Sequence, residues 1–430
     1  MCITWVAIAL FLSCSFMSTW ENTKKLSLRC CCCHSLSREM VPCSHRIRGY
    51  LSNVSFFSGF NTFFPHYSLH LPRYTMLFLS EQEKRQWAGY ANDILRDVVP
   101  PGHYDAKVRR NLVPAFHFYI ATLLAANGAG EQSTEWLETG TLLEENGLFS
   151  CAFLLGFLKR HGNQLAMPAV AFQDPRPFIH FAGVPAMRGA RLQFIRQFGH
   201  SLPVFDGPVR FMDIGCGDGA LTATLLTHLQ ETGKVPGVRE ILLVEPSPAM
   251  ADLARETVGT IFPDAVIAVE NCRIQDCSHR IDHAFDIAMS SLAYHHMPLE
   301  DKRTHLTQLK PWIDHLLLFE LDANNDTPDL FSPELALSVY QSYGRIIDFV
   351  FAHDAPVDVV IDCVDSFLMT ELVSILSQPR GVRTDYHMLR NQWNALFSEV
   401  LGPEFSLRCD SASYADEYIT LFTLHYGRDR

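Results

Sequence analysis

The sequence predicts an α/β fold that follows a mostly helical N-terminal region. Two patterns lead to this prediction. Between residues 76 and 200, apolar residues recur at the spacing of one helix face. Beyond residue 200, apolar runs of strand length alternate with helical stretches, which is typical of a parallel sheet covered by helices on both faces. The chain has 430 residues, 48% of them hydrophobic, and is long enough for a catalytic core and a second module.

The first 75 residues differ in composition from the rest of the chain. We expect residues 1–75 to be a leader that is disordered or lies outside the functional fold, with a secretory signal or anchor as the less favoured interpretation. Ser80 and Glu83 support a start of the fold at Met76, because their spacing is that of a capping box. The apolar stretch from Ile3 to Met17 has no basic residue before it and is short for a membrane span, so we expect no stable membrane insertion.

The charge and the cysteine content indicate which binding partners and which cellular compartment to expect. The formal net charge of -12 argues against a nucleic-acid partner, because such binding depends on Lys and Arg neutralising phosphates. A small-molecule substrate is therefore the better expectation. The cysteines after residue 75 have neither the spacing of a disulfide framework nor that of metal ligands, which indicates a reducing, cytoplasmic compartment.

The elements after Met76 are predicted from apolar spacing and from helix-breaking residues. Helices are expected over 80–99, 105–126, 143–162 and 189–200, with another starting at 133 and with Pro114 disturbing the second. Five parallel strands are expected at Val209–Ile214, Glu240–Val244, Ala265–Val269, Phe285–Ser290 and His315–Phe319. A closing hairpin is expected from Ser406–Cys409 and Ile419–Tyr426, after a helical insertion at about 330–396 that covers the substrate.

The first predicted strand turns into a helix through three glycines, Gly215, Gly217 and Gly219. Glycines at such a turn let a ligand lie against the backbone at a helix N-terminus. The turn also matches the dinucleotide fingerprint if Ala220 takes the third small position, so an NAD-dependent oxidoreductase is one interpretation.

Two carboxylates and a following turn distinguish the alternatives. Asp213 lies two residues before the first glycine, and Glu245 ends the second predicted strand, where its two oxygens suit a ribose diol. Glu245 is followed by Pro246 and Ser247, which lead into a helix. Over roughly residues 205–325 this ordered set resembles the class I S-adenosylmethionine-dependent methyltransferases, a Rossmann-like family, of the small-molecule type.

The resemblance implies a cofactor site for S-adenosylmethionine. The turn from Gly215 to Gly219 would approach the methionine portion, and Asp213 would bind its amino group. Glu245 would bind the ribose, and Pro246 or Ser247 would border the adenine. Asp276, after the third strand, is the candidate for the adenine amine, with a solvated loop acid as the alternative. The resemblance also suggests that 76–200 is a dimerisation or substrate-cap domain of winged-helix type, and that 201–430 is catalytic; a helical bundle without a ligand role is the alternative for the first.

The end of the fourth predicted strand should face the reaction centre, because ligands in open α/β sheets gather at the carboxyl ends of strands. This segment carries Ser290, Ser291, Tyr294, His295 and His296. We predict His295 or His296 as general base, since a neutral imidazole titrates near operating pH. The alternative is that the two histidines cap a helix or shape the pocket.

Other polar residues have weaker predicted roles. Glu320 and Asp322 lie at the end of the fifth strand, but no metal triad is evident, and we expect no metal. Anion binding is considered for four residues of the insertion, namely Arg380, Arg383, His387 and Arg390. The predicted function is methyl transfer to oxygen, nitrogen or carbon of a small organic acceptor, such as a 2-oxo acid or a secondary metabolite. The alternatives are an NAD-dependent oxidoreductase and a methyltransferase-like binding protein without turnover, and a homodimer is the expected assembly.

Overall fold

The computed structural model describes residues 76–429, except 145–147 and 169–173. The predicted leader, residues 1–75, lies outside the described residues. Among the helices that are described, none is long and apolar enough to cross a membrane.

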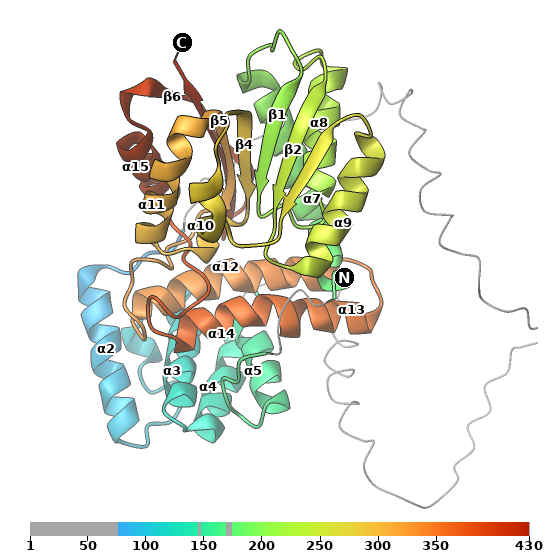
Figure 1. The fold of residues 1–430 in the computed structure, drawn as a ribbon. Coiled ribbons are helices and arrows are strands. Elements are labelled where there is room, and N and C mark those ends of the chain that lie inside the picture. Colours follow the sequence, from blue (N-terminus) through green and yellow to red (C-terminus); the bar gives the residue numbers. More distant parts are fainter. Residues whose placement is uncertain (1–75, 145–147, 169–173, 430) are drawn as a thin grey trace, which may run out of the picture. The chain divides into compact units, whose positions relative to one another are not determined.

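A seven-stranded sheet forms the centre of the α/β part (Figure 1). Its strands are β1 (Val209–Ile214), β2 (Val238–Val244), β3 (Val266–Glu270), β4 (Phe285–Ser291), β5 (Ile313–Leu321), β6 (Phe405–Ala415) and β7 (Thr420–Arg428). The strand order is β3-β2-β1-β4-β5-β7-β6, with β1 to β5 parallel and β7 antiparallel to β5 and β6. All seven predicted strands are confirmed. The register pairs Ile214 with Val244 and with Ser290, so the carboxyl ends of three strands meet at one edge.

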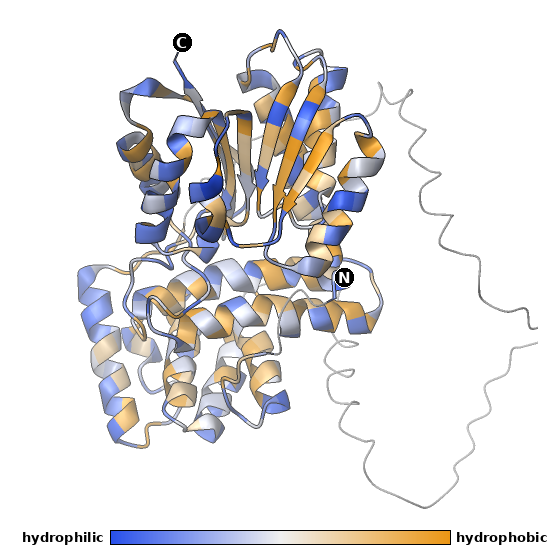
Figure 2. Ribbon diagram, viewed as in Figure 1, coloured by the Kyte–Doolittle hydropathy of each residue, from blue (hydrophilic) through white to orange (hydrophobic). Residues whose placement is uncertain are grey.

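Both faces of the sheet are buried. Phe211 and Leu243 belong to the hydrophobic core on one face, and Met212 and Val244 belong to a second core on the other face. Successive residues of a strand point to opposite faces, so near-continuous apolar runs are expected of a sheet covered on both sides. Figure 2 shows β1 to β3 largely in the hydrophobic colour.

Two groups of helices cover the sheet. The contacts place α7 (Pro185–Ser201), α8 (Ala220–Glu231) and α9 (Pro248–Ile261) together, with α7 against β6 and β7 and α9 against β2 and β3. A second group consists of α10 (Ile274–Cys277), α11 (Leu299–Leu309) and α15 (Arg390–Leu401), with α15 against β7. Short turns complete this part: η3 (Ser278–Arg280), η4 (Tyr294–His296), η5 (Lys310–Trp312) and η7 (Gly402–Glu404).

The N-terminal region is helical, as predicted. It comprises α2 (Glu81–Arg96), η1 (Asp105–Lys107), η2 (Arg110–Leu112), α3 (Val113–Ala126), α4 (Gly130–Leu143), α5 (Ser150–Arg160) and α6 (Arg176–Gly183). The Ser80–Glu83 capping box is present at the start of α2. Pro114 does not disturb a helix, because α3 begins at Val113 and proline is tolerated in the first turn. No strand occurs between 76 and 200 in the part that the structure describes, so the hairpin of a winged helix is not seen there.

The insertion forms a layer of helices at the carboxyl edge of the sheet. It contains α12 (Pro333–Ala352), α13 (Val357–Asp362), the π-helical turn η6 (Cys363–Leu368) and α14 (Met369–Ser377). In Figure 1, α12 and α14 run across this edge of the sheet, on the side of α3, α4 and α5, and α12 contacts α3 and α5. The helices of this segment join the N-terminal helices in one layer. The division into domains at residue 200 stays a prediction.

Candidate active site

A cavity of about 1050 Å³ lies at the carboxyl edge of the sheet. One wall is made by the ends of β1, β2 and β4 and by the turns that follow them. The opposite wall is made by α12, η6, α14 and a loop at 381–387. The two walls bring together residues as distant in the sequence as Asp213 and Asp385.

The glycine turn forms part of the first wall. Gly215, Gly217 and Gly219 all have positive φ angles, of 74°, 55° and 73°. A Cβ on Gly219 would lie 3.0 Å from the Cα of Ala254, and a Cβ on Gly215 would collide with the side chain of Ala293. Only glycine accommodates both the positive φ angles and these close contacts without strain. The turn therefore stays open to a ligand at the start of α8.

Asp213 is buried below the glycine turn, 2% exposed. Its Oδ2 accepts a hydrogen bond from the hydroxyl of Thr222, whereas Oδ1 has no hydrogen-bond partner among the described residues. Burial raises the pKa of Asp213 to about 7, and the nearby carboxylate of Glu245 adds to this rise. A buried carboxylate oxygen without a donor is costly, and a cationic ligand group would satisfy it.

Arg191 is a cavity residue that the sequence analysis missed. It lies on α7, and its Nε has no hydrogen-bond partner in the described parts of the chain. Burial lowers its pKa, while Asp218 and Asp213 act in the opposite direction. The guanidinium and the Asp213 carboxylate thus offer one positive and one negative group to the same cavity. No sequence motif marks an arginine on the helix before the first strand.

Glu245 holds the turn after β2 in place. Its Oε2 accepts from the backbone N–H of Gly217 at 3.1 Å, and its Oε1 accepts from that of Ser247 at 3.0 Å. Burial raises its pKa, although these two N–H donors oppose the rise. Each carboxylate oxygen keeps a lone pair for a ligand hydroxyl. Pro246 and Ser247 line the cavity beside it.

Asp276 does not lie on the cavity wall. Its carboxylate pairs with the guanidinium of Arg273, with Oδ2 and Nε 2.9 Å apart, and half of its side chain is exposed. The cavity is lined instead by the four residues before it, Cys272 to Gln275. The structure therefore does not bring Asp276 to the other predicted cofactor residues, and Gln275 is the polar side chain available at that place.

His295 is held in position by Glu320. The Glu320 carboxylate accepts from the backbone N–H of Ala293 and of His295, and its Oε2 lies 2.9 Å from Nδ1 of the His295 ring. Both side chains are buried. Leu292, before them, has a positive φ of 51°, which is a strained backbone for leucine. Strain of this kind persists where surrounding contacts fix the chain, here at the predicted reaction centre.

His296 has a different environment. Its ring is 40% exposed, and its Nδ1 lies 2.9 Å from Oδ1 of the buried Asp385. Desolvation opposes protonation, but the carboxylates of Asp385 and Glu371 outweigh it and raise the pKa of His296 to about 10. A charged imidazolium donates protons and does not accept them. This environment disfavours His296 as a general base.

Not all the polar residues predicted beside them reach the cavity. Ser291 lines it, but Tyr294 lies in the second core, where its hydroxyl bonds to Nε2 of His305 at 2.8 Å. Asp322 accepts from the backbone N–H of Arg390. Glu320 and Asp322 were predicted together at the end of the fifth strand, but they bind different groups: Glu320 binds His295, and Asp322 binds the backbone of Arg390.

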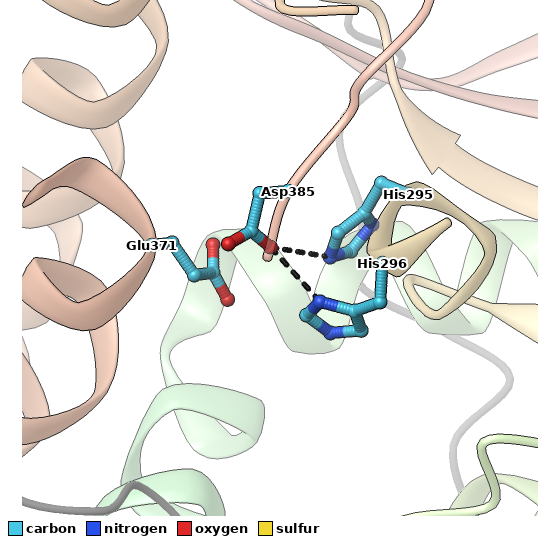
Figure 3. A group of neighbouring side chains, drawn as sticks. All are labelled: His295, His296, Glu371 and Asp385. Carbon is cyan, nitrogen blue, oxygen red and sulfur yellow. Dashed lines mark ion pairs between the residues drawn. The ribbon is translucent and has the colours of Figure 1, made fainter. Parts of the chain in front are cut away.

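The opposite wall carries a buried polar network. The Tyr343 hydroxyl donates to Oε2 of Glu371 at 2.6 Å and lies 3.3 Å from Nε2 of His387. Burial and the neighbouring Asp385 raise the pKa of Glu371 to about 7. Figure 3 shows Glu371 and Asp385 on one side, facing His295 and His296 on the other. Tyr343, Glu371 and Asp385 were missed by the sequence analysis, because nothing local links them to the strand ends.

Residues 211–314 match the model of a family described as a methyltransferase domain. This part of the chain is a class I S-adenosylmethionine-dependent methyltransferase domain. The family match and the sheet order agree with the resemblance found in the sequence, and they favour methyl transfer over the NAD-dependent alternative. No curated protein matches the chain.

Several solved structures are similar to the chain at low identity. SCL7 of Oryza sativa is 14% identical, with a TM-score of 0.49, over 72% of this chain and 99% of that one. The magnesium protoporphyrin IX methyltransferase of Synechocystis PCC 6803, crystallised with SAH, is 12% identical, with a TM-score of 0.36, over 59% and 93%. The plantazolicin methyltransferase BpumL, also with SAH, is 12% identical, with a TM-score of 0.36, over 59% and 90%.

The four anion-binding candidates of the methyltransferase insertion separate into two groups. Arg380 pairs with Asp326 and Glu300, and Arg390 pairs with Asp410, so both already have carboxylate partners. Arg383 and His387 line the cavity instead.

Arg383 is a buried cation, 4% exposed. No carboxylate of the described chain lies within ion-pair distance of it, and its Nε and Nη1 have no hydrogen-bond partner there. Its guanidinium packs on the Tyr386 ring, 5.3 Å from the centroid. Burial lowers its pKa. A buried, unpaired guanidinium is unfavourable unless an anion joins it, so this side chain is available to an anionic ligand.

Two groups of cavity side chains could hold a metal ion. His295, His296, Glu371 and Asp385 place one ligand atom each within 4.8 Å of one another, and so do His295, Glu320 and His387. The prediction of no metal therefore remains open to test.

Proposed function

We propose that the protein transfers the methyl group of S-adenosylmethionine to a small organic acceptor bound in this cavity. One observation carries the proposal: a single cavity is lined by the glycine turn with Asp213 and Glu245, by His295 after β4, and by the polar wall opposite them. Its volume of about 1050 Å³ suits a cofactor and a small acceptor together.

The chain supplies a partner for each part of the cofactor. Asp213 offers its unpartnered oxygen to the amino group, and Arg191 offers its guanidinium to the carboxylate. Glu245 offers lone pairs to the ribose hydroxyls, and Pro246 and Ser247 border the adenine end. The charge pattern supports an amino-acid moiety, which carries both charges, at this wall.

The bound cofactor supplies an activated methyl group as a sulfonium, so orientation provides much of the rate. The residues of the chain then have three tasks: to align the acceptor, to exclude water, and to take up its proton where the methylated atom carries one. The helices α12 and α14 line the cavity, where they would shield the acceptor from water. His295 stays the predicted base, because Glu320 orients its ring and leaves Nε2 facing the cavity side.

The acceptor that the cavity favours carries an anionic group. Arg383 supports this, because its buried guanidinium has no carboxylate partner within the described chain. A bidentate carboxylate, as in a 2-oxo acid, would pair with it. The atom methylated, a homodimer through 76–200 and a cytoplasmic location stay predictions.

The direct test incubates the full chain with methyl-labelled S-adenosylmethionine and a small-molecule extract of the producing cells, separated by anion exchange. We expect label in a product from the anion-retained fraction. Transfer to acceptors of the unretained fraction would contradict the anionic acceptor but leave methyl transfer intact. No transfer in any fraction would contradict the proposed function.

A further inference from the structure

The His295 ring leaves a lone pair that faces another acceptor. Its Nδ1 lies 2.9 Å from Oε2 of Glu320, and an ionised carboxylate only accepts, so Nδ1 carries the proton. In the neutral ring Nε2 is then an acceptor. Nε2 lies 3.9 Å from Oδ1 of Asp385, which is fully buried and makes no hydrogen bond among the described residues. Two acceptors that face each other across this distance leave room for a cation between them.

A second histidine converges on the same oxygen. Nδ1 of His296 lies 2.9 Å from Oδ1 of Asp385, but this contact lacks hydrogen-bond geometry, and the nitrogen bonds instead to the Thr384 carbonyl at 3.3 Å. The carboxylate of Glu371 completes the group, with all four ligand atoms within 4.8 Å. In Figure 3 both dashed lines end on one oxygen of Asp385, and the Glu371 carboxylate points toward the same space. The donors come from η4, α14 and the 381–387 loop, so the fold and not one local motif assembles them.

We propose that His295, His296, Asp385 and Glu371 bind a divalent first-row transition-metal ion. Imidazole nitrogen together with carboxylate oxygen suits Zn²⁺, Fe²⁺ or Mn²⁺. Glu320 would act on the ion through His295, since a carboxylate on the second ring nitrogen fixes the ring orientation and raises its basicity. The Tyr343 hydroxyl would hold Glu371 in the same indirect way.

The electrostatics of the group favour a positive charge. Three acidic residues, Glu320, Glu371 and Asp385, lie around it, and all three are buried or largely buried. The site spans both walls, with the histidines from the turn after β4 and the carboxylates from α14 and the 381–387 loop, so an acceptor oxygen or nitrogen in the cavity could join the ion. Binding of the acceptor by the ion rests on the proposed function. In the metal site His295 would be a ligand and not a general base.

The other cluster of ligand types outside the cavity centre is a weaker candidate. Glu270, Cys272 and Cys277 are also within 4.8 Å of one another. The Arg280 guanidinium already lies there, 2.9 Å from Glu270 and 3.6 Å from the Cys272 sulfur. This cluster therefore has its own cation, but a test must distinguish it from the proposed site.

The experiment measures metal content of the full chain. The protein is stripped with a chelator, reconstituted separately with Zn²⁺, Fe²⁺ or Mn²⁺, desalted and analysed by mass spectrometry of the elements. We expect one ion per chain for at least one metal, and its loss to background in Asp385→Asn and in His296→Gln. Glu320→Gln should keep the ion but weaken its affinity about 10- to 100-fold, measured against a competing chelator.

Two control variants should keep the ion. His283→Gln changes a histidine that also pairs with two carboxylates, Asp282 and Glu240, but lies outside the cavity. Cys277→Ser changes the second cluster. Titration of each variant with S-adenosylhomocysteine reports folding and the cofactor site independently.

Two results would overturn the metal site. The first is a wild-type chain that retains none of the three ions while it still binds S-adenosylhomocysteine. The second is loss of the ion in Cys277→Ser with retention in both Asp385→Asn and His296→Gln. If the ion binds as expected but S-adenosylhomocysteine does not, the metal site stands and the proposed function fails.

Discussion

The two walls of the cavity are built on different principles. In the cofactor wall, Glu245 is held by backbone N–H groups of Gly217 and Ser247, all within the first two β–α turns. In what we call the acceptor wall, which comprises the turn after β4 and the helices and loop opposite it, side chains hold one another: Glu320 holds His295, and Tyr343 holds Glu371. The first wall thus depends on local backbone geometry, whereas the second depends on the packing of the insertion against the sheet.

This difference affects what each wall tolerates. Backbone donors remain when a side chain is replaced, so a change at Glu245 should act mainly on the ligand. Side-chain networks lose the partner of a buried group when one member is removed. The unpartnered groups nevertheless occur on both walls, at Asp213 on the first and at Arg383 on the second, and they mark where each ligand should bind.

The largest expected effect is on the pH dependence of stability through Asp213. Its folded pKa of about 7 lies above the ordinary value of 3.8, so the folded state prefers the protonated acid. The free energy of unfolding without ligand should therefore fall as pH rises from about 4 to 7, by on the order of 4 kcal/mol for this group. Asp213→Asn should remove that fall and be the more stable chain at pH 8, as measured by urea unfolding at several pH values.

The control for this prediction is Asp276→Asn, because Asp276 is half exposed and paired with Arg273. It should follow the wild-type pH dependence. An Asp213→Asn chain with the same pH dependence as the wild type would show that Asp213 is ionised in the ligand-free fold.

The next effect is on cofactor affinity. Asp213→Asn and Glu245→Gln should each weaken S-adenosylhomocysteine binding by about 1.5–3 kcal/mol, because each removes a hydrogen bond to a charged group. Asp213→Asn should thus stabilise the free protein and weaken its complex. Calorimetric titration measures the affinity, and Asp276→Asn should remain close to wild type. Unchanged affinity in both cavity variants would contradict the assigned cofactor wall.

The acceptor wall gives a comparable prediction at Arg383. Arg383→Gln should raise the KM for an anionic acceptor by about tenfold or more, since a charged hydrogen bond is lost, and it should leave S-adenosylhomocysteine affinity unchanged. Arg380→Gln is the matched control, because Arg380 already pairs with Asp326 and Glu300. Steady-state kinetics with the labelled methyl donor would measure both. Equal KM values for the two variants would contradict the role of Arg383.

The smallest expected effect is on the stability of the fold, and it distinguishes backbone strain from tight packing in the glycine turn. Gly219 and Gly233 have similar φ angles, of 73° and 70°, but only Gly219 has atoms within 4 Å of an added Cβ. Both Gly→Ala changes should destabilise the fold by the cost of a left-handed residue, about 1–2 kcal/mol. Gly219→Ala should cost about 1 kcal/mol more, through its contact with Ala254. Thermal unfolding compares the two, and equal losses would show that the turn is loosely packed on α9.

The same contrast explains how much the sequence predicts. The strands could be located because a sheet buried on both faces requires apolar runs, and the turn because positive φ angles at Gly215 and Gly219 require glycine. Asp213 and Glu245 follow from their fixed spacing to these elements. Asp276 does not line the cavity, because a short helix, α10, turns its side chain toward Arg273.

The acceptor wall could be predicted only in part. His295 and His296 follow a strand end, but the sequence does not indicate that Glu320 orients one and Asp385 charges the other. Arg383 was one of four candidates of equal rank. Arg383 is buried, whereas Arg380 pairs with Asp326, and both facts depend on the tertiary fold.

The most direct test of the assigned site is calorimetric titration of the full chain with S-adenosylhomocysteine, with NAD as the comparison ligand. We predict saturable binding of S-adenosylhomocysteine alone, with an affinity that Asp213→Asn and Glu245→Gln reduce. Absence of binding, or a preference for NAD, would contradict the identification of the glycine turn as a methyl-donor site.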